Sequence, residues 1–147
     1  MDLNPSDLTG GLDPDREFVL ATAPDDPEMR ESVNAWVWDD GTAFGLPRLG
    51  VEAVGGQWDT PDIQVNIALA GGRVVTMFQP GEAHPPLGDD GRPRVLGSGP
   101  LRFELVEPFR HWRAQLQGPG TEITVEDQLA GWFPGGEGTS VPVELEV

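Results

Sequence analysis

The chain of 147 residues contains no cysteine, no tyrosine and no lysine. Without cysteine it has no thiol nucleophile, thiolate metal site, iron–sulfur cluster or disulfide, so nothing in the sequence points to an oxidising compartment. Without lysine it has no side chain for a Schiff base or for the usual phosphate-binding loop. The residues left for chemistry are mainly carboxylates, two histidines and five tryptophans.

Basic residues are scarce, and all nine of them are arginines, against 25 acidic residues. The formal net charge of −16 repels phosphate backbones and anionic lipid headgroups, so we expect neither nucleic-acid binding nor membrane insertion. No apolar run approaches the roughly 20 residues that a membrane span needs. The N-terminal sequence also lacks the basic start and apolar stretch of a signal peptide. We therefore expect a cytoplasmic protein.

Twenty glycines and 15 prolines favour many short elements joined by turns over long helices. Residues 1–29 form an acidic, proline-rich lead-in, in which only Phe18, Val19 and Leu20 are suited to dock on a core. Residues 30–147 are predicted to form a single β domain. No helix of ten or more residues is expected.

Alternation of apolar and polar residues predicts about eight strands. It is clearest at 31–38, ESVNAWVW, and is followed by a turn signal. Gly71 and Gly72 predict a hairpin turn, and a second hairpin is expected around Pro108. Together these signals predict an all-β fold, an antiparallel lipocalin-like barrel or a strongly curved sandwich. The expected strands are 31–38, 45–54, 58–69, 73–79, 101–107, 111–117, 121–127 and 140–147.

The last expected strand, SVPVELEV, runs to residue 147 without a closing turn or a polar tail. An edge strand of this kind favours pairing with another chain or domain. We therefore expect a second β domain or a homo-oligomer partner at the C-terminal strand.

The polar positions of the first three core strands combine tryptophans with polar side chains. A solvated sheet surface is one interpretation, and a ligand pocket is the other, because pockets mix aromatic rings with a few fixed polar groups. Within this set, Arg48 and Glu52 project from the same strand and predict a structural ion pair. The candidate ligand-binding residues here are Trp36, Trp38, Arg48, Glu52, Trp58, Gln64 and Asn66.

Asp59 follows Trp58 at the start of a predicted strand, where a pocket mouth is expected. An indole beside a carboxyl group favours the protonated acid, which makes Asp59 the candidate catalytic acid. His84 lies in a proline-flanked loop and is a candidate rim residue for the ligand, whereas His111 is expected to face water. Two histidines without metal-ligand spacing predict no metal site, and no cofactor is expected.

The run from ESVNAWVWDDGTAFGLPRLGVEAVGG to DDGRPRVLGSGPLRFELVEPFRHWR, roughly residues 30–117, resembles the lipocalin-like proteins grouped with hydroxyneurosporene synthase (carotenoid 1,2-hydratase), the AttH-like family. The resemblance implies two lipocalin-like β domains in tandem, of which this chain is long enough for the first. It also implies hydration or cyclisation of isoprenoid or polyene double bonds in a hydrophobic pocket.

We therefore expect a domain that binds a hydrophobic small molecule, in which Asp59 protonates a double bond and aromatic faces stabilise the resulting cation. One alternative is a carrier that binds such a ligand without catalysis. Another is a carbohydrate-binding β-sandwich with a tryptophan platform. Geometry distinguishes a carbohydrate platform from a lipocalin-like pocket, because a platform exposes its rings on a flat or convex surface and the pocket encloses them.

Overall fold

Eight strands form one antiparallel sheet in the computed structural model, which describes residues 7–41, 43–131 and 138–147. Two short 3-10 helices, η1 and η2, and one short α-helix, α1, accompany the strands. The elements are η1 (Pro14–Glu17), β1 (Arg30–Trp38), β2 (Phe44–Val54), η2 (Gly55–Gln57), β3 (Asp62–Leu69), β4 (Arg73–Pro80), β5 (Val95–Ser98), β6 (Leu101–Glu107), β7 (His111–Thr124), α1 (Val125–Leu129) and β8 (Thr139–Glu146).

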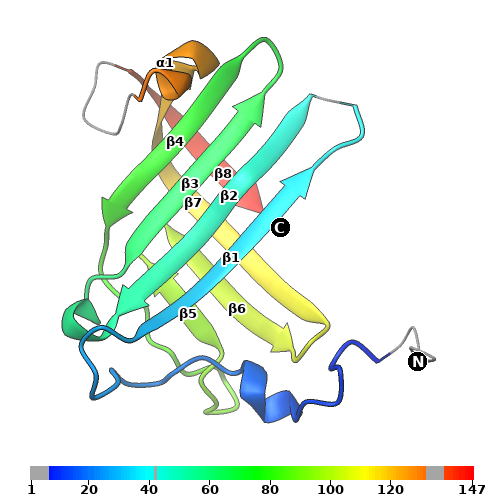
Figure 1. Cartoon of the computed structure of the whole chain (residues 1–147), viewed down its shortest axis with the longest axis vertical. Coiled ribbons are helices and arrows are strands. Elements are labelled where there is room, and N and C mark those ends of the chain that lie inside the picture. The colour runs from blue at the N-terminus through cyan, green and yellow to red at the C-terminus, as the bar shows by residue number, and fades with distance from the viewer. Residues whose placement is uncertain (1–6, 42, 132–137) are drawn as a thin grey trace.

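The sheet is folded into two layers that face each other. Strands β1 to β4 make one layer and β5 to β8 make the other, and the strands of the two layers cross at a steep angle (Figure 1). Within the described residues β1 pairs only with β2, so the sheet is not closed into a barrel. The prediction of an all-β antiparallel fold with about eight strands is confirmed in its curved-sandwich form.

Strand β7 joins the two layers. Its first half pairs with β6 as far as Leu116, and from Thr121 it pairs with β4, while β8 runs along its other edge. Gly120 lies between the residues of β7 that pair with β6 and those that pair with β4, and a Cβ at this position would stand 2.6 Å from a methyl carbon of Val75. Glycine therefore leaves room for Val75 of β4 at the point where the strand changes partners.

This continuity corrects two strand predictions. Residues 111–117 and 121–127 were expected as separate strands, because glycine and proline between them are turn signals. They form the single strand β7, which ends at Thr124, and α1 begins at Val125. The Thr124 side chain caps α1 in a capping box with Asp127, which ends the strand by satisfying the first helical N–H groups.

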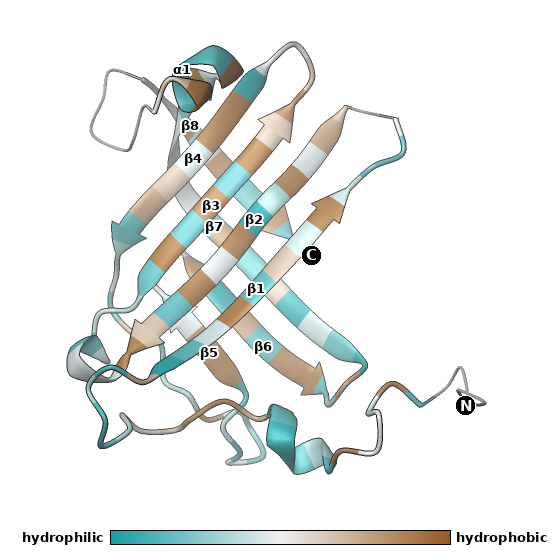
Figure 2. Ribbon diagram, in the orientation of Figure 1, coloured by the Kyte–Doolittle hydropathy of each residue, from teal (hydrophilic) through white to brown (hydrophobic). Residues whose placement is uncertain are grey.

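The two layers meet in an apolar core. The inward apolar positions of β2 and β3 alternate with mostly polar positions on the opposite face, as the stripes in Figure 2 show, whereas Val74 to Met77 of β4 are all buried. The largest fully buried side chains include Phe103, Leu46, Leu49 and Ile63. The N-terminal lead-in also contributes to the core, since Val19 is 5% exposed.

Both predicted hairpins are present. Strands β3 and β4 meet at Leu69 and Arg73 through a loop in which Gly71 and Gly72 have positive φ. Strands β6 and β7 are joined through residues 108–110, in which Phe109 has φ 58. Most other strand boundaries differ from expectation by at most one residue, but β3 begins at Asp62 and not at residue 58. Strand β5, which is four residues long, was not predicted. Among the described residues, no helix is long and apolar enough to cross a membrane.

Candidate functional site

A pocket of about 300 Å³ lies where the β2–β3 connection, the loop after β4, strand β5 and the N-terminal segment meet. We call it the Trp58–His84 pocket. Ten of its thirteen lining residues are apolar, and its only ionisable side chains belong to Asp59 and His84. Its walls are formed by Leu20, Ala21, Ala53, Trp58, Asp59, Pro61, Ala83, His84, Pro85, Pro86, Val95, Leu96 and Gly97.

Backbone hydrogen bonds hold these walls together. The N–H of Ala83 donates to the carbonyl of Asp59 at 3.0 Å, and the N–H of His84 donates to the carbonyl of Gly97 at 3.1 Å. The hydroxyl of Ser98, which is fully buried, donates to the carbonyl of Pro61 at 2.6 Å. Hydrogen bonds therefore join the loop after β4 and strand β5 to the β2–β3 connection, and the fold itself holds the walls of the pocket.

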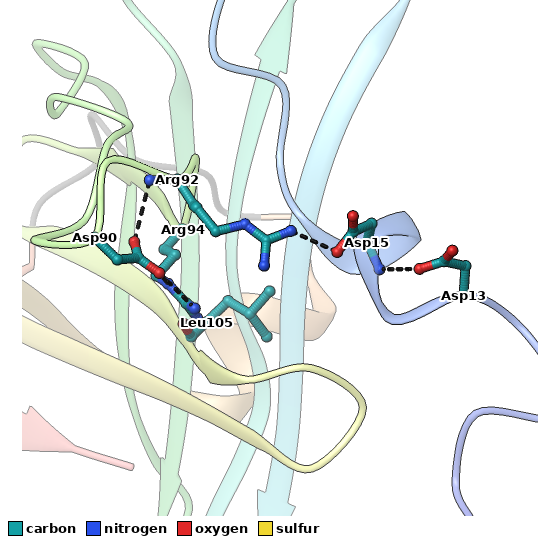
Figure 3. A network of polar contacts seen from close by, with 6 residues as sticks. All are labelled: Asp13, Asp15, Asp90, Arg92, Arg94 and Leu105. Carbon is teal, nitrogen blue, oxygen red and sulfur yellow. Dashed lines mark hydrogen bonds and ion pairs between the residues drawn. The ribbon is translucent and has the colours of Figure 1, made fainter.

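Ion pairs, hydrogen bonds and contacts with one aromatic ring hold the N-terminal segment beside this pocket. Arg92 forms an ion pair with Asp15, whose N–H donates to the side chain of Asp13, and Arg94 pairs with Asp90 and donates to the carbonyl of Leu105 (Figure 3). The same two guanidinium groups stack over one aromatic ring, with Arg92 3.7 Å and Arg94 5.0 Å from the centroid of Phe18.

These contacts bring the chain beyond Phe18 to the pocket. The side chain of Val19 enters the core, its N–H donates to the carbonyl of Pro93, and Leu20 and Ala21 then line the Trp58–His84 pocket. Of the three residues expected to dock on the core, Val19 is buried in it, whereas Phe18 is half-buried beneath the two guanidinium groups and Leu20 is 38% exposed. Residues 1–6 of the lead-in lie outside the described residues.

Three of the nine predicted site residues, Trp58, Asp59 and His84, line this pocket. Trp58 also packs against the core. The side chain of Asp59 is exposed at the pocket and not buried. This position removes the desolvation on which its predicted role as a catalytic acid depends.

The other six predicted residues lie on the outer face of β1 to β3. Trp36 and Trp38 alternate with Val33, Ala35 and Val37, which pack on the core, and they are 64% and 73% exposed. The structure therefore does not bring them to Trp58. The residues on this outer face are Trp36, Trp38, Arg48, Glu52, Gln64 and Asn66.

The predicted ion pair between Arg48 and Glu52 is wrong. Glu52 pairs instead with Arg30 of β1, at 2.8 Å, because Arg30 lies on the neighbouring strand two residues from its cross-strand partner. The Nε atom of Arg48 is buried and has no hydrogen-bond partner among the described residues. Asn66 accepts a hydrogen bond from Gln128 of α1 at 2.9 Å, which ties the helix to this face.

A second, smaller cleft of about 270 Å³ opens between the layers at β8. It is lined mainly by apolar side chains, including Phe44 and Leu69 of the first layer and Val143 and Leu145 of the second. Because these side chains pack against the same core, the space between the layers narrows to a cleft. Neither Asp59 nor His84 lines this second cleft.

The sequence signals missed several wall residues. Val95, Leu96 and Gly97 belong to a strand too short for alternation to reveal, and Ala83 had no distinguishing pattern. The prolines beside His84 were the available sequence signal for this part of the pocket wall, because a proline-rich segment next to a strand favours an irregular loop. Within the described part of the chain, no group of three or more His, Asp or Glu side chains is placed to hold a metal ion.

No family model, curated protein or solved structure matches this chain, and so its resemblance to the AttH-like family stays a prediction.

Proposed function

We propose that this domain binds a small, largely apolar molecule in the Trp58–His84 pocket. The observation that carries the proposal is the convergence of Trp58, Asp59 and His84, chosen from the sequence, on one pocket with apolar walls. Its volume of about 300 Å³ is at the lower end of the range for small-molecule sites, roughly 300–1,000 Å³. The hydrogen-bonded walls support binding without a large ordering cost.

The resemblance to the AttH-like family makes an isoprenoid or polyene the first ligand class to test. In the enzymatic version of the proposal the domain hydrates or cyclises such a molecule, with Asp59 as the acid. In the carrier version it only binds. The exposure of Asp59 favours the carrier version, because its carboxyl group lacks the apolar enclosure on which the role of a catalytic acid depends.

The test is a fluorescence titration with polyenes and terpenes, accompanied by product analysis. Trp58→Ala is expected to weaken binding about tenfold or more, which corresponds to about 1.4 kcal/mol. Trp38→Ala, on the outer face, is the matched control and is expected to bind as the unmodified protein does. Equal binding by Trp58→Ala and the unmodified protein would overturn the pocket assignment. Turnover that Asp59→Asn abolishes would favour the enzyme.

A second candidate function, carbohydrate binding, is favoured by the exposure of Trp36 and Trp38. The two rings project from the same face of β1, with a spacing of about 7 Å along the strand. Exposed aromatic rings on an outer face form a platform and not an enclosed pocket. Retention on insoluble cellulose, chitin or starch tests it. The Trp36→Ala/Trp38→Ala double variant is expected to lose any retention that this platform provides.

The cytoplasmic location, the second domain or homo-oligomer partner at the C-terminal strand, and the absence of nucleic-acid binding stay predictions from the sequence.

A further inference from the structure

The ionisable side chains that line the Trp58–His84 pocket belong to Asp59 and His84, and none of its lining residues is an arginine. The pocket also belongs to a chain with a formal net charge of −16. A cleft lined by one sign of charge concentrates ligands of the opposite sign. The electrostatics of this site therefore favour a cation over an anion.

Among the described residues, no hydrogen-bond donor contacts the carboxylate of Asp59. The backbone of Asp59 is held by the hydrogen bond from Ala83, but its side chain takes part in no ion pair or hydrogen bond among the described residues. Six other carboxylates of the described residues are paired with arginine, as Glu52 is with Arg30. Asp59 thus offers an unused acceptor at a largely apolar pocket.

His84 is the other polar side chain of the pocket. Its Nε2 lies 2.9 Å from the carbonyl oxygen of Gly99, and because a carbonyl only accepts, Nε2 is the donor of this hydrogen bond. Nδ1 lies against Gly97 of the same pocket wall, where a Cβ would stand 2.5 Å from it. The ring of His84 is therefore held in the wall, and Asp59 supplies the polar group of the pocket that has no partner among the described residues.

We propose that the ligand of this pocket is an apolar molecule that carries a cationic amine. The ammonium group pairs with the Asp59 carboxylate, and the hydrocarbon part occupies the space beside Trp58 and Leu96. The Trp58 ring adds a face to which a cation is attracted. This inference rests on the proposed function, since it names the class of molecule that the same pocket takes.

The test compares geranylamine with geraniol, which share one hydrocarbon skeleton and differ in the charged group. Both are titrated into the full chain at neutral pH and low ionic strength by calorimetry. We expect the amine to bind about tenfold more tightly than the alcohol, and its advantage to fall in high salt, whereas the affinity of the alcohol stays unchanged. Asp59→Asn is expected to remove the advantage of the amine.

Asp62→Asn is the matched control, because it changes the net charge by the same amount as Asp59→Asn. Asp62 lies three residues after Asp59 in the sequence and does not line the pocket. This control is expected to keep the preference for the amine. Equal affinity of the unmodified protein for both probes would overturn the inference and leave the proposed function standing. Binding of neither probe would overturn both. An amine preference that survives Asp59→Asn would also overturn the role given to this carboxylate.

Discussion

The indole Nε1 of Trp112 donates a hydrogen bond of 2.8 Å to the carboxylate of Glu17, across 95 residues of sequence. The other oxygen of the same carboxylate accepts the backbone N–H of Phe109 in the β6–β7 hairpin. One side chain of η1 therefore holds both the hairpin and β7. Since Val19, Leu20 and Ala21 follow directly, this contact helps to position the N-terminal wall of the pocket.

Glu17→Gln is expected to lower the free energy of unfolding by about 1–3 kcal/mol, because the amide NH₂ group leaves one of the two donors without an acceptor. Urea denaturation followed by tryptophan fluorescence measures the change. Glu28→Gln, at an exposed position without a side-chain hydrogen bond, is the control and should leave stability unchanged. Equal stability of the two variants would show that the contact does not hold the segment.

Ser98→Ala is expected to cost about 1 kcal/mol of stability, because it removes the buried hydrogen bond to the carbonyl of Pro61. The cost stays moderate because the N–H of Gly81 also donates to that carbonyl, at 3.1 Å. Ser140→Ala, on the exposed side of β8, is the matched substitution. Thermal unfolding of both variants gives the comparison, and a Ser98→Ala protein as stable as the control would contradict the expectation.

Gly97→Ala is expected to deform the Trp58–His84 pocket. The new Cβ would stand 2.5 Å from Nδ1, 2.6 Å from Cγ and 3.0 Å from Cβ of His84, so the whole ring has to move. Ligand affinity should fall at least about tenfold, with a loss of stability of about 1–3 kcal/mol. In Gly41→Ala the added Cβ meets its nearest neighbour, Asp39, at 3.4 Å, and this variant should bind normally. Normal binding by Gly97→Ala would place the ligand elsewhere.

The ion pair between Arg73 and Glu122 spans the junction of β4 and β7, with Nη2 and Oε2 2.6 Å apart. The hydrogen bond from Arg73 holds the pKa of Glu122 below its usual value of 4.5. A lowered carboxyl pKa gives stability that is present above pH 4.5 and is lost as the pH falls through the folded-state pKa.

We therefore expect Arg73→Gln to be less stable than the unmodified protein at pH 7 and to approach it in stability as the pH falls through the lowered pKa of Glu122. Denaturation midpoints at several pH values measure this convergence. Because both side chains are partly exposed, high salt should also reduce the difference. A difference that stays constant from pH 7 to pH 3 would mean that the effect of the substitution comes from packing and not from the ion pair.

The tryptophans also differ in their expected effects on stability. Trp36→Ala and Trp38→Ala remove exposed rings and should change the free energy of unfolding by about 0.5 kcal/mol or less. Trp58→Ala removes a ring packed on the core and should cost about 2 kcal/mol or more. Chemical denaturation of the three variants tests this order. Three equal losses would contradict the outward orientation of Trp36 and Trp38.

Local patterns were enough to predict much of the fold. Alternation along 31–38 correctly places Val33 and Val37 on one face of the strand and Trp36 on the other, because successive side chains in a strand point to opposite faces. The turn at Gly71 and Gly72 was predictable for the same reason, since positive φ is a local preference of glycine. The pattern could not show which face of each strand is enclosed by the second layer.

The candidate site depended more on long-range contacts. Trp58, Asp59 and His84 were chosen one by one from their neighbours in sequence, but their convergence depends on the bonds from Ala83 to Asp59 and from His84 to Gly97. The ion pair of Glu52 could not be predicted from spacing within one strand, because its partner Arg30 lies on another strand. Strand pairing decides such contacts.

The sequence by itself determined the all-β antiparallel fold, most of the strands, both predicted hairpins and the short list of groups available for chemistry, because each depends on residue type or on period-two alternation. Only the tertiary structure decided that 111–124 is one strand, that Trp36 and Trp38 face outward, and that the N-terminal segment forms a wall of the pocket. These features arise when a sheet folds on itself and brings distant segments together, and that closure depends on packing between the layers.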